Sequence, residues 1–110
     1  MIFIDNILIV NLCNTYKDNC SKEYLKSITT GDWKIEKKKV NKIKYIVGLY
    51  KKQIISAYTI VEQPTYISDE NRFRFCNVVE NTNLLTKLKS KYDNNLIMYG
   101  PILYLNCYDL

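Results

Sequence analysis

The sequence predicts an α+β fold, a small mixed β-barrel of five to seven strands with two short helices. Runs of β-branched and aromatic residues, bounded by turn residues, fill most of the chain. Only two segments space their apolar residues as an amphipathic helix does, and the elements do not alternate as βαβ units. The 110 residues suffice for one hydrophobic core, so we expect a single domain over residues 1–110.

The first third of the chain predicts a strand, a helix and an extended segment. The strand is expected within Ile2–Leu12, which is mostly apolar. Ser21 can cap the helix that follows, and Gly31 is suited to end it. Trp33 then begins an extended segment. The apolar side of the helix would carry Tyr24, Leu25 and Ile28.

A β-hairpin is the clearest prediction in the middle of the chain. Two runs rich in β-branched and aromatic residues, Lys44–Tyr50 and Ile54–Val61, flank Lys51-Lys52-Gln53. This turn lacks the expected glycine or asparagine. Gly48 in mid-strand indicates a bulge or the close approach of another group. Alternation places one set of first-arm residues on a common face: Ile43, Tyr45, Val47 and Leu49.

The remainder predicts a loop, a strand, a helix and two final strands. Residues 63–71 form the loop, and Arg72–Val79 form the strand. A helix capped by Asn81 or Thr82 would run through Tyr92. Its buried stripe would be Leu84, Leu85, Leu88 and Tyr92. The final strands are expected at Leu96–Tyr99 and Ile102–Tyr108.

Composition argues against catalysis, metals and cofactors. The chain has no histidine, the usual general base at neutral pH. Its four cysteines form no C-x-x-C pair, so zinc would require folding to gather scattered thiolates, and we expect reduced, mostly buried thiols. Three glycines leave no phosphate-cradling loop. We therefore expect a non-enzymatic protein without a bound metal or cofactor.

A cytoplasmic location is expected, in the host cytoplasm if the protein is viral. No window approaches the roughly 18 unbroken apolar residues of a spanning helix. The apolar N-terminal run is interrupted by Asp5, Asn6 and Asn11, and it lacks the basic leader and cleavage site of a signal peptide. We expect no membrane partner.

Positive charge is concentrated in one segment. The net charge is +5, and eight of the lysines fall between Lys34 and Lys52. Such a cluster either attracts phosphates or is a solvated loop. Many Ile, Asn, Lys and Tyr residues beside a single alanine indicate an AT-rich, phage-like genome, which enriches lysine for reasons unrelated to binding.

The order of these pieces resembles the PUA-like superfamily, which includes the EVE, ASCH and YTH domains. A capped helix ends just before a tryptophan, a lysine-rich strand leads into the hairpin, and an Arg-x-x-Phe strand follows. A helix and a terminal Pro-Ile-x-Tyr strand close the chain. The matching positions are Trp33, Gly48, Arg72 with Phe75, and Pro101 with Tyr104. The resemblance implies a barrel with a pocket for a base or nucleotide, Trp33 as a pocket wall and Arg72 near the bound polar group.

The residues themselves suit the same ligands. Aromatic rings stack on bases, and paired guanidiniums hold phosphates or base edges. Candidate binding residues are Trp33, Tyr50 and Tyr66 for stacking and Arg72, Arg74, Lys34 and Lys44 for the basic rim. The alternatives are that the tryptophan plugs the end of the barrel and that the arginines pair with nearby acids: Glu62, Asp69 and Glu70.

Three functions follow in order of preference. The first is a module that binds a nucleotide or nucleic acid. The second is a phage anti-defence protein that sequesters a cyclic or other signalling nucleotide. The third is an inhibitor that docks a protein partner through an apolar sheet edge or tyrosine-rich face. Edge strands rich in isoleucine and tyrosine also favour a homo-oligomer.

Overall fold

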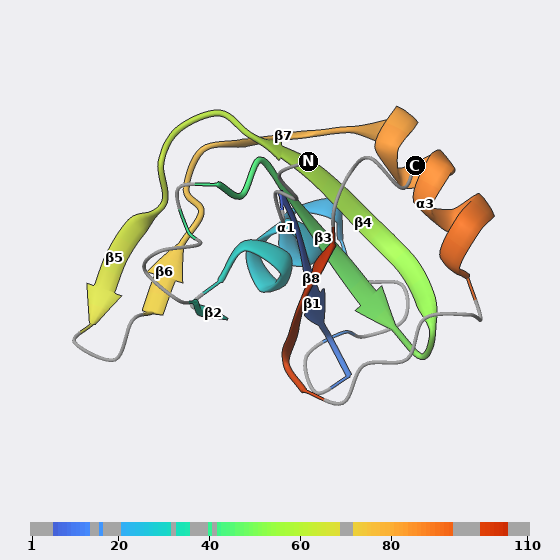
Figure 1. Ribbon diagram of the computed structural model, residues 1–110, viewed down its shortest axis with the longest axis horizontal. Coiled ribbons are helices and arrows are strands. Elements are labelled where there is room, and N and C mark those ends of the chain that lie inside the picture. The colour runs from blue at the N-terminus through green and yellow to red at the C-terminus, as the bar shows by residue number, and fades with distance from the viewer. Residues whose placement is uncertain are drawn as a thin grey trace, which may run out of the picture.

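The computed structural model describes residues 6–13, 16, 21–31, 33–35, 40, 42–68, 72–93 and 100–105. Its strands form a five-stranded sheet in the order β7-β4-β3-β1-β8 and a three-stranded sheet in the order β2-β6-β5. Figure 1 shows β2, β5 and β6 on one side of the molecule, α3 on the other, and α1 between them. The elements are β1 (Ile7–Asn11), α1 (Lys22–Thr30), β2 (Trp33–Lys34), β3 (Tyr45–Tyr50), β4 (Gln53–Ile60), β5 (Thr65–Ser68), β6 (Arg72–Arg74), β7 (Val78–Glu80), α3 (Thr82–Tyr92) and β8 (Ile102–Leu105).

Strand β1 lies inside the five-stranded sheet, parallel to β3 and antiparallel to β8. Its apolar run Ile7–Val10 is completely buried. A strand with both faces covered has no polar side, so its sequence is continuously apolar rather than alternating. The predicted first strand is therefore confirmed over Ile7–Asn11, and the expectation for residues 1–5 lies outside the described residues.

Two hydrophobic cores lie on opposite faces of this sheet. One contains Leu8 and Ile46 of the sheet with Phe73 and Phe75, and α1 packs Leu25 against it. The other contains Ile9, Val47 and Ile54 with the α3 residues Leu84 and Leu88. The predicted alternation of the first hairpin arm is confirmed for Tyr45, Val47 and Leu49, whereas Ile43 precedes the strand and joins the first core.

The hairpin of β3 and β4 turns through two lysines. Tyr50 pairs with Gln53, so only Lys51 and Lys52 form the loop. Both have positive φ, 47° and 67°. Positive φ at both central residues defines the type I′ turn, whose twist matches the flanking strands. The geometry therefore follows the twist of the strands although neither residue favours it.

Gly48 confirms both features expected of it. The register shifts between Gly48 and Leu49, leaving Ile55 as an extra residue on β4. A Cβ atom on Gly48 would collide with Ser56 Oγ and would lie 2.7 Å from Leu12 Cδ1 and 3.2 Å from Thr29 Oγ1. Only glycine lets α1 and β4 approach β3 this closely.

Helix α1 begins as predicted and ends by a different device. Ser21 Oγ accepts a hydrogen bond from Tyr24 N at 3.0 Å. Gly31 follows the helix with φ of −65°, so it does not form the left-handed cap that glycine often provides. The last carbonyls are bonded from other elements instead: Thr29 O by the indole Nε1 of Trp33 at 2.8 Å and Thr30 O by Phe75 N at 3.1 Å.

Helix α3 confirms its predicted cap and stripe. Asn81 Oδ1 accepts from Leu84 N at 2.9 Å, and Leu84 and Leu88 are buried. At its other end, Asp93 Oδ1 accepts from Ile54 N, and Lys89 Nζ donates to Ile54 O. The helix thereby bonds the backbone of β4 where β7 does not reach, because β7 pairs only with Tyr58–Ile60.

The predicted strand Arg72–Val79 is wrong as a single strand. Arg72–Arg74 is β6 of the small sheet, and Val78–Glu80 is β7 of the five-stranded sheet. Between β6 and β7, Phe75 N donates to Thr30 O of α1, so it does not pair with a strand. The predicted loop at residues 63–71 is also partly wrong, since Thr65–Ser68 is β5, paired with β6 across a bulge.

The α+β class with two helices is confirmed. The described residues contain eight strands rather than five to seven, because the predicted strand is split and β5 is added. These strands form two separate sheets, and no closed barrel is formed by them. The predicted strand Leu96–Tyr99 lies outside the described ranges, and the last strand is described over Ile102–Leu105. No helix in the described part of the chain is long and apolar enough to cross a membrane.

Candidate functional site

The small sheet gathers three of the predicted cations on one face. Lys34 of β2 pairs directly with Arg72 of β6. Directly paired residues point to the same side of a sheet, and residues two apart along a strand share a side, so Arg74 joins them. All three side chains are exposed. We name Lys34, Arg72 and Arg74 the basic face.

The opposite face of the same sheet carries an aromatic row. Trp33, Phe73 and Tyr66 pair across β2, β6 and β5. The rings of Tyr66 and Phe73 lie 5.3 Å apart between centroids. Phe73 is buried in the core, Trp33 is half-buried and Tyr66 is 43% exposed. Aromatics and cations of the predicted site therefore lie on opposite faces rather than around one pocket.

Trp33 joins the small sheet to α1. Its indole donates to Thr29 O, and its ring packs against the core that contains Phe73. A tryptophan that caps a helix and fills a core explains its position without a ligand. Its partly exposed edge is the part that a ligand can contact.

Tyr50 and Lys44 lie apart from the basic face. Tyr50 ends β3 beside the hairpin turn, where its ring contacts Tyr16 at 4.6 Å and Lys51 Nζ lies 5.2 Å from its centroid. Figure 1 shows this turn on the side of α3, away from β2, β5 and β6. Lys44 is exposed just before β3, and its backbone N–H bonds Asn6 O. The seven predicted residues thus belong to at least three places.

Arg74 also faces the C-terminal end of α1. With Ser27, Thr30 and Gly31 it lines an open hollow of about 390 Å³. No basic residue occupies the last turn of the helix itself. The helix dipole is negative at this end, so a guanidinium here is favourable and stabilises the helix.

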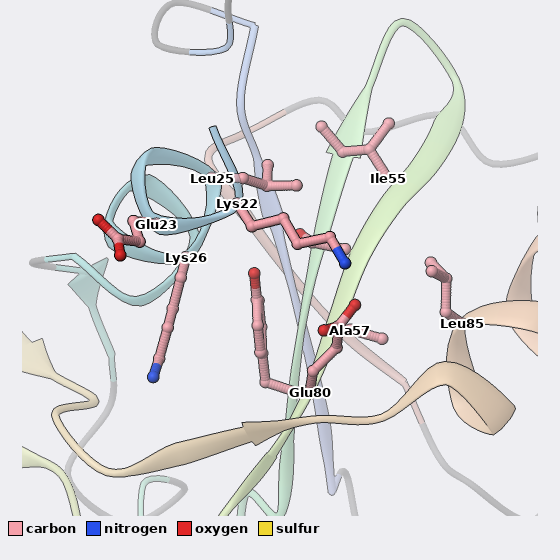
Figure 2. Close-up of a pocket in the computed structure, with 10 residues that line it drawn as sticks. Lys22, Glu23, Leu25, Lys26, Ile55, Ala57, Glu80 and Leu85 are labelled. Atoms are coloured by element: carbon pink, nitrogen blue, oxygen red, sulfur yellow. The ribbon is translucent and has the colours of Figure 1, made fainter. Parts of the chain in front are cut away.

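A second hollow was not predicted from the sequence. It is a cavity of about 220 Å³ between α1, β4, β7 and α3. Figure 2 shows Lys22 extending from α1 across β4 toward Glu80 of β7, while Glu23 points to the other side of the helix. Its lining consists of Lys22, Glu23, Leu25, Lys26, Ile55, Ser56, Ala57, Tyr58, Glu80 and Leu85. We name it the edge cavity, and none of the seven predicted residues lines it.

A buried pair of hydroxyls, Thr29 and Ser56, lies at the edge cavity, and Ser56 is the one that lines it. Thr29 Oγ1 donates its one proton to Leu25 O at 2.7 Å. Its 2.9 Å contact with Ser56 Oγ must then be donated by Ser56. Both side chains are at least nine-tenths buried. The Ser56 hydroxyl therefore has no proton left to donate to a ligand.

Sequence reasoning missed this cavity because its lining comes from four elements. One signal was present, since Gly48 indicated a close approach, and Ser56 and Thr29 are two of the groups that approach it. No spacing along the chain indicates that the pairing of β7 with β4 ends at Tyr58, or that α3 lies beside the next part of β4.

Metal chemistry has no support in the described residues, which contain no group of three or more His, Cys, Asp or Glu side chains able to hold an ion. Cys13 and Cys76 are free thiols and are exposed, which corrects the expectation that most thiols are buried. Cys20 and Cys107 lie outside the described ranges.

Comparison with known proteins identifies no relative. No family model, no curated protein and no solved structure matches this chain significantly. Its function is therefore argued from the basic face and the edge cavity.

Proposed function

We propose that this chain is a non-enzymatic nucleic-acid-binding module of the PUA-like type that holds a nucleic-acid strand on the basic face. The observation that carries the proposal is the register of the small sheet, which sets Lys34 beside Arg72 with Arg74 on the same exposed side. Three cations on neighbouring strands match a row of phosphates. Arginine also contacts phosphate bidentately.

The assignment to the PUA-like type rests on the order of elements. A Ser21-capped helix precedes Trp33, the β3–β4 hairpin follows, and then β6, α3 and β8 complete the chain. A small barrel that includes both sheets is part of this proposal. The connection from β4 to β5, residues 61–64, and the segment between β6 and β7 both join the two sheets.

A nucleic-acid strand is favoured over a free nucleotide as the ligand because of the shape of the basic face. Of the two hollows described above, neither is lined by Lys34 or Arg72, and Arg74 lines only the open one at the end of α1. A flat cationic surface gains its affinity from several phosphates at once, whereas a single nucleotide needs an enclosed pocket. Tyr66 lies on the opposite face of the edge strand β5, so it would stack a base where the nucleic acid passes round that edge.

The test is fluorescence titration of labelled single-stranded RNA and DNA at several salt concentrations. Three phosphate contacts predict a slope of log K against log salt of about −2, or roughly tenfold to twentyfold weaker binding between 50 and 200 mM salt. The double variant Arg72→Gln/Arg74→Gln should weaken binding and reduce the slope to about −0.7. The charge-matched control Lys52→Gln/Lys87→Gln changes exposed lysines outside the small sheet.

Other outcomes identify the other functions. Tight, salt-insensitive binding of a cyclic or signalling nucleotide would replace this proposal by sequestration. If neither strands nor nucleotides bind, the protein-inhibitor function becomes the better proposal. Equal losses in the arginine variant and its lysine control would show a general charge effect and refute a defined basic face.

A further inference from the structure

We propose that the edge cavity binds a small zwitterion, a free α-amino acid with an aliphatic side chain. This site is separate from the basic face and does not depend on nucleic-acid binding. It lies where the pairing of β7 with β4 ends and the backbone of β4 is bonded from the end of α3. Its volume of about 220 Å³ exceeds what a single water occupies and suits a ligand of amino-acid size.

Two opposite charges face one another across the mouth. Lys22 reaches over β4 from α1, and Glu80 rises toward it from β7 (Figure 2). Both residues lie in the described part of the chain, and no ion pair joins Lys22 to Glu80 there. Lys22 can bind a carboxylate, and Glu80 can bind an ammonium group. A zwitterion meets both charges in one small molecule.

The interior matches the remaining parts of an amino acid. Ser56 is a lining residue, and because its hydroxyl gives its proton to Thr29 it offers the ligand no hydrogen-bond donor. Apolar walls for an aliphatic side chain come from Leu25, Ile55 and Leu85. Their burial by the ligand would supply the hydrophobic part of the affinity.

The charges also argue against a phosphate in this cavity. Its lining contains two lysines and two glutamates, a net charge of zero. A phosphate bound by Lys22 would carry its negative charge toward Glu80, and like charges repel at short range. The edge cavity therefore differs in ligand class from the basic face.

Trp33 provides the readout. Its indole bonds Thr29 O, and the hydroxyl of the same threonine bonds Ser56. The chain's single tryptophan is thus connected through Thr29 to Ser56, a residue that lines the site. Leucine, isoleucine, valine and methionine should be titrated into the full chain at millimolar concentration, with Trp33 fluorescence and melting temperature followed together.

The expected result is saturable binding of leucine and at least about tenfold weaker binding of both leucinamide, which lacks the carboxylate, and N-acetylleucine, which lacks the ammonium group. Lys22→Gln should weaken leucine binding by about tenfold and remove the preference for leucine over leucinamide. Glu80→Gln should remove the preference over N-acetylleucine. Lys87→Gln, another exposed helical lysine, is the matched control.

Three results would overturn the proposal. One is no response to any amino acid by a folded protein, and another is equal affinity for leucine and both derivatives. The third is a response to nucleotides that Lys22→Gln abolishes. The Arg72→Gln/Arg74→Gln variant separates the two sites: it should lose nucleic acid and still bind leucine. Loss of leucine binding in that variant would contradict an independent edge cavity.

Discussion

The two sheets of this protein use their faces differently. Both faces of the five-stranded sheet are covered, one by α1 with Trp33, Phe73 and Phe75 and the other by α3. The small sheet covers a core with one face and presents Lys34, Arg72 and Arg74 to solvent on the other. The first sheet therefore supplies stability, and it offers ligands only its edge. The small sheet can vary its exposed face without loss of packing.

The largest expected effect tests the first half of this comparison. Leu88→Ala, at a completely buried position between α3 and the five-stranded sheet, should destabilise the protein by about 2–5 kcal/mol. Tyr66→Ala, at a half-exposed position on β5, removes the ring contact with Phe73 and should cost less, about 1 kcal/mol. Urea denaturation measures both. Equal losses would mean that the small sheet is as important to stability as the large one.

Gly48→Ala comes next and probes the contact of the five-stranded sheet with α1. The new methyl group would overlap Ser56 Oγ and crowd Leu12, so we expect a loss of about 1–3 kcal/mol. Gly100→Ala is the control because nothing lies within 4 Å of its Cβ position. Adding Ser56→Ala to Gly48→Ala should recover part of the loss. An unchanged denaturation midpoint would show that α1 and β3 are not tightly packed.

Trp33→Phe tests the connection between the two sheets. Phenylalanine keeps an aromatic ring but removes the indole N–H from Thr29 O, which should cost about 1 kcal/mol. Tyr50→Phe serves as the control, since its hydroxyl has no hydrogen bond to the described residues. Thermal unfolding followed by circular dichroism compares the two. A Trp33→Phe protein as stable as the parent would remove the proposed capping role of the indole.

The smallest effect is a gain in stability at the hairpin turn. Lys51→Asn/Lys52→Gly supplies the residues that a type I′ turn favours and should stabilise by about 0.5–1 kcal/mol. Lys51→Gln/Lys52→Gln removes the same charges without relieving the positive φ values. If both variants gain equally, charge repulsion rather than backbone conformation is the cause.

Local signals predicted the parts of this fold that depend on neighbours in sequence. Ser21 and Asn81 cap the two helices, and the leucine stripe of α3 is buried, because caps and stripes act within a few residues. Local signals predicted the hairpin equally well. They did not predict its turn, because the twist of the strands overrides the preference of lysine for negative φ.

The errors come from partners distant in sequence. Arg72–Val79 was predicted as one strand, yet a hydrogen bond from Phe75 N to Thr30 O divides the run between two sheets. The same division determines which residues meet. The sequence predicted Trp33, Tyr66 and Arg72 as a group, but only register shows that the aromatics and the cations occupy opposite faces.

The position of Cys76 gives the molecule a chemical handle. Its exposed thiol lies on the segment that passes from β6 to β7, with Sγ 3.8 Å from Thr65 Oγ1 of β5. A maleimide dye attached there would sit beside the small sheet and at the start of the link to the large one. In a variant whose other cysteines are replaced by serine, the dye and Trp33 would form a donor–acceptor pair within one molecule. Energy transfer between them would then record whether β2 and the segment that leaves β6 move relative to one another when a ligand binds.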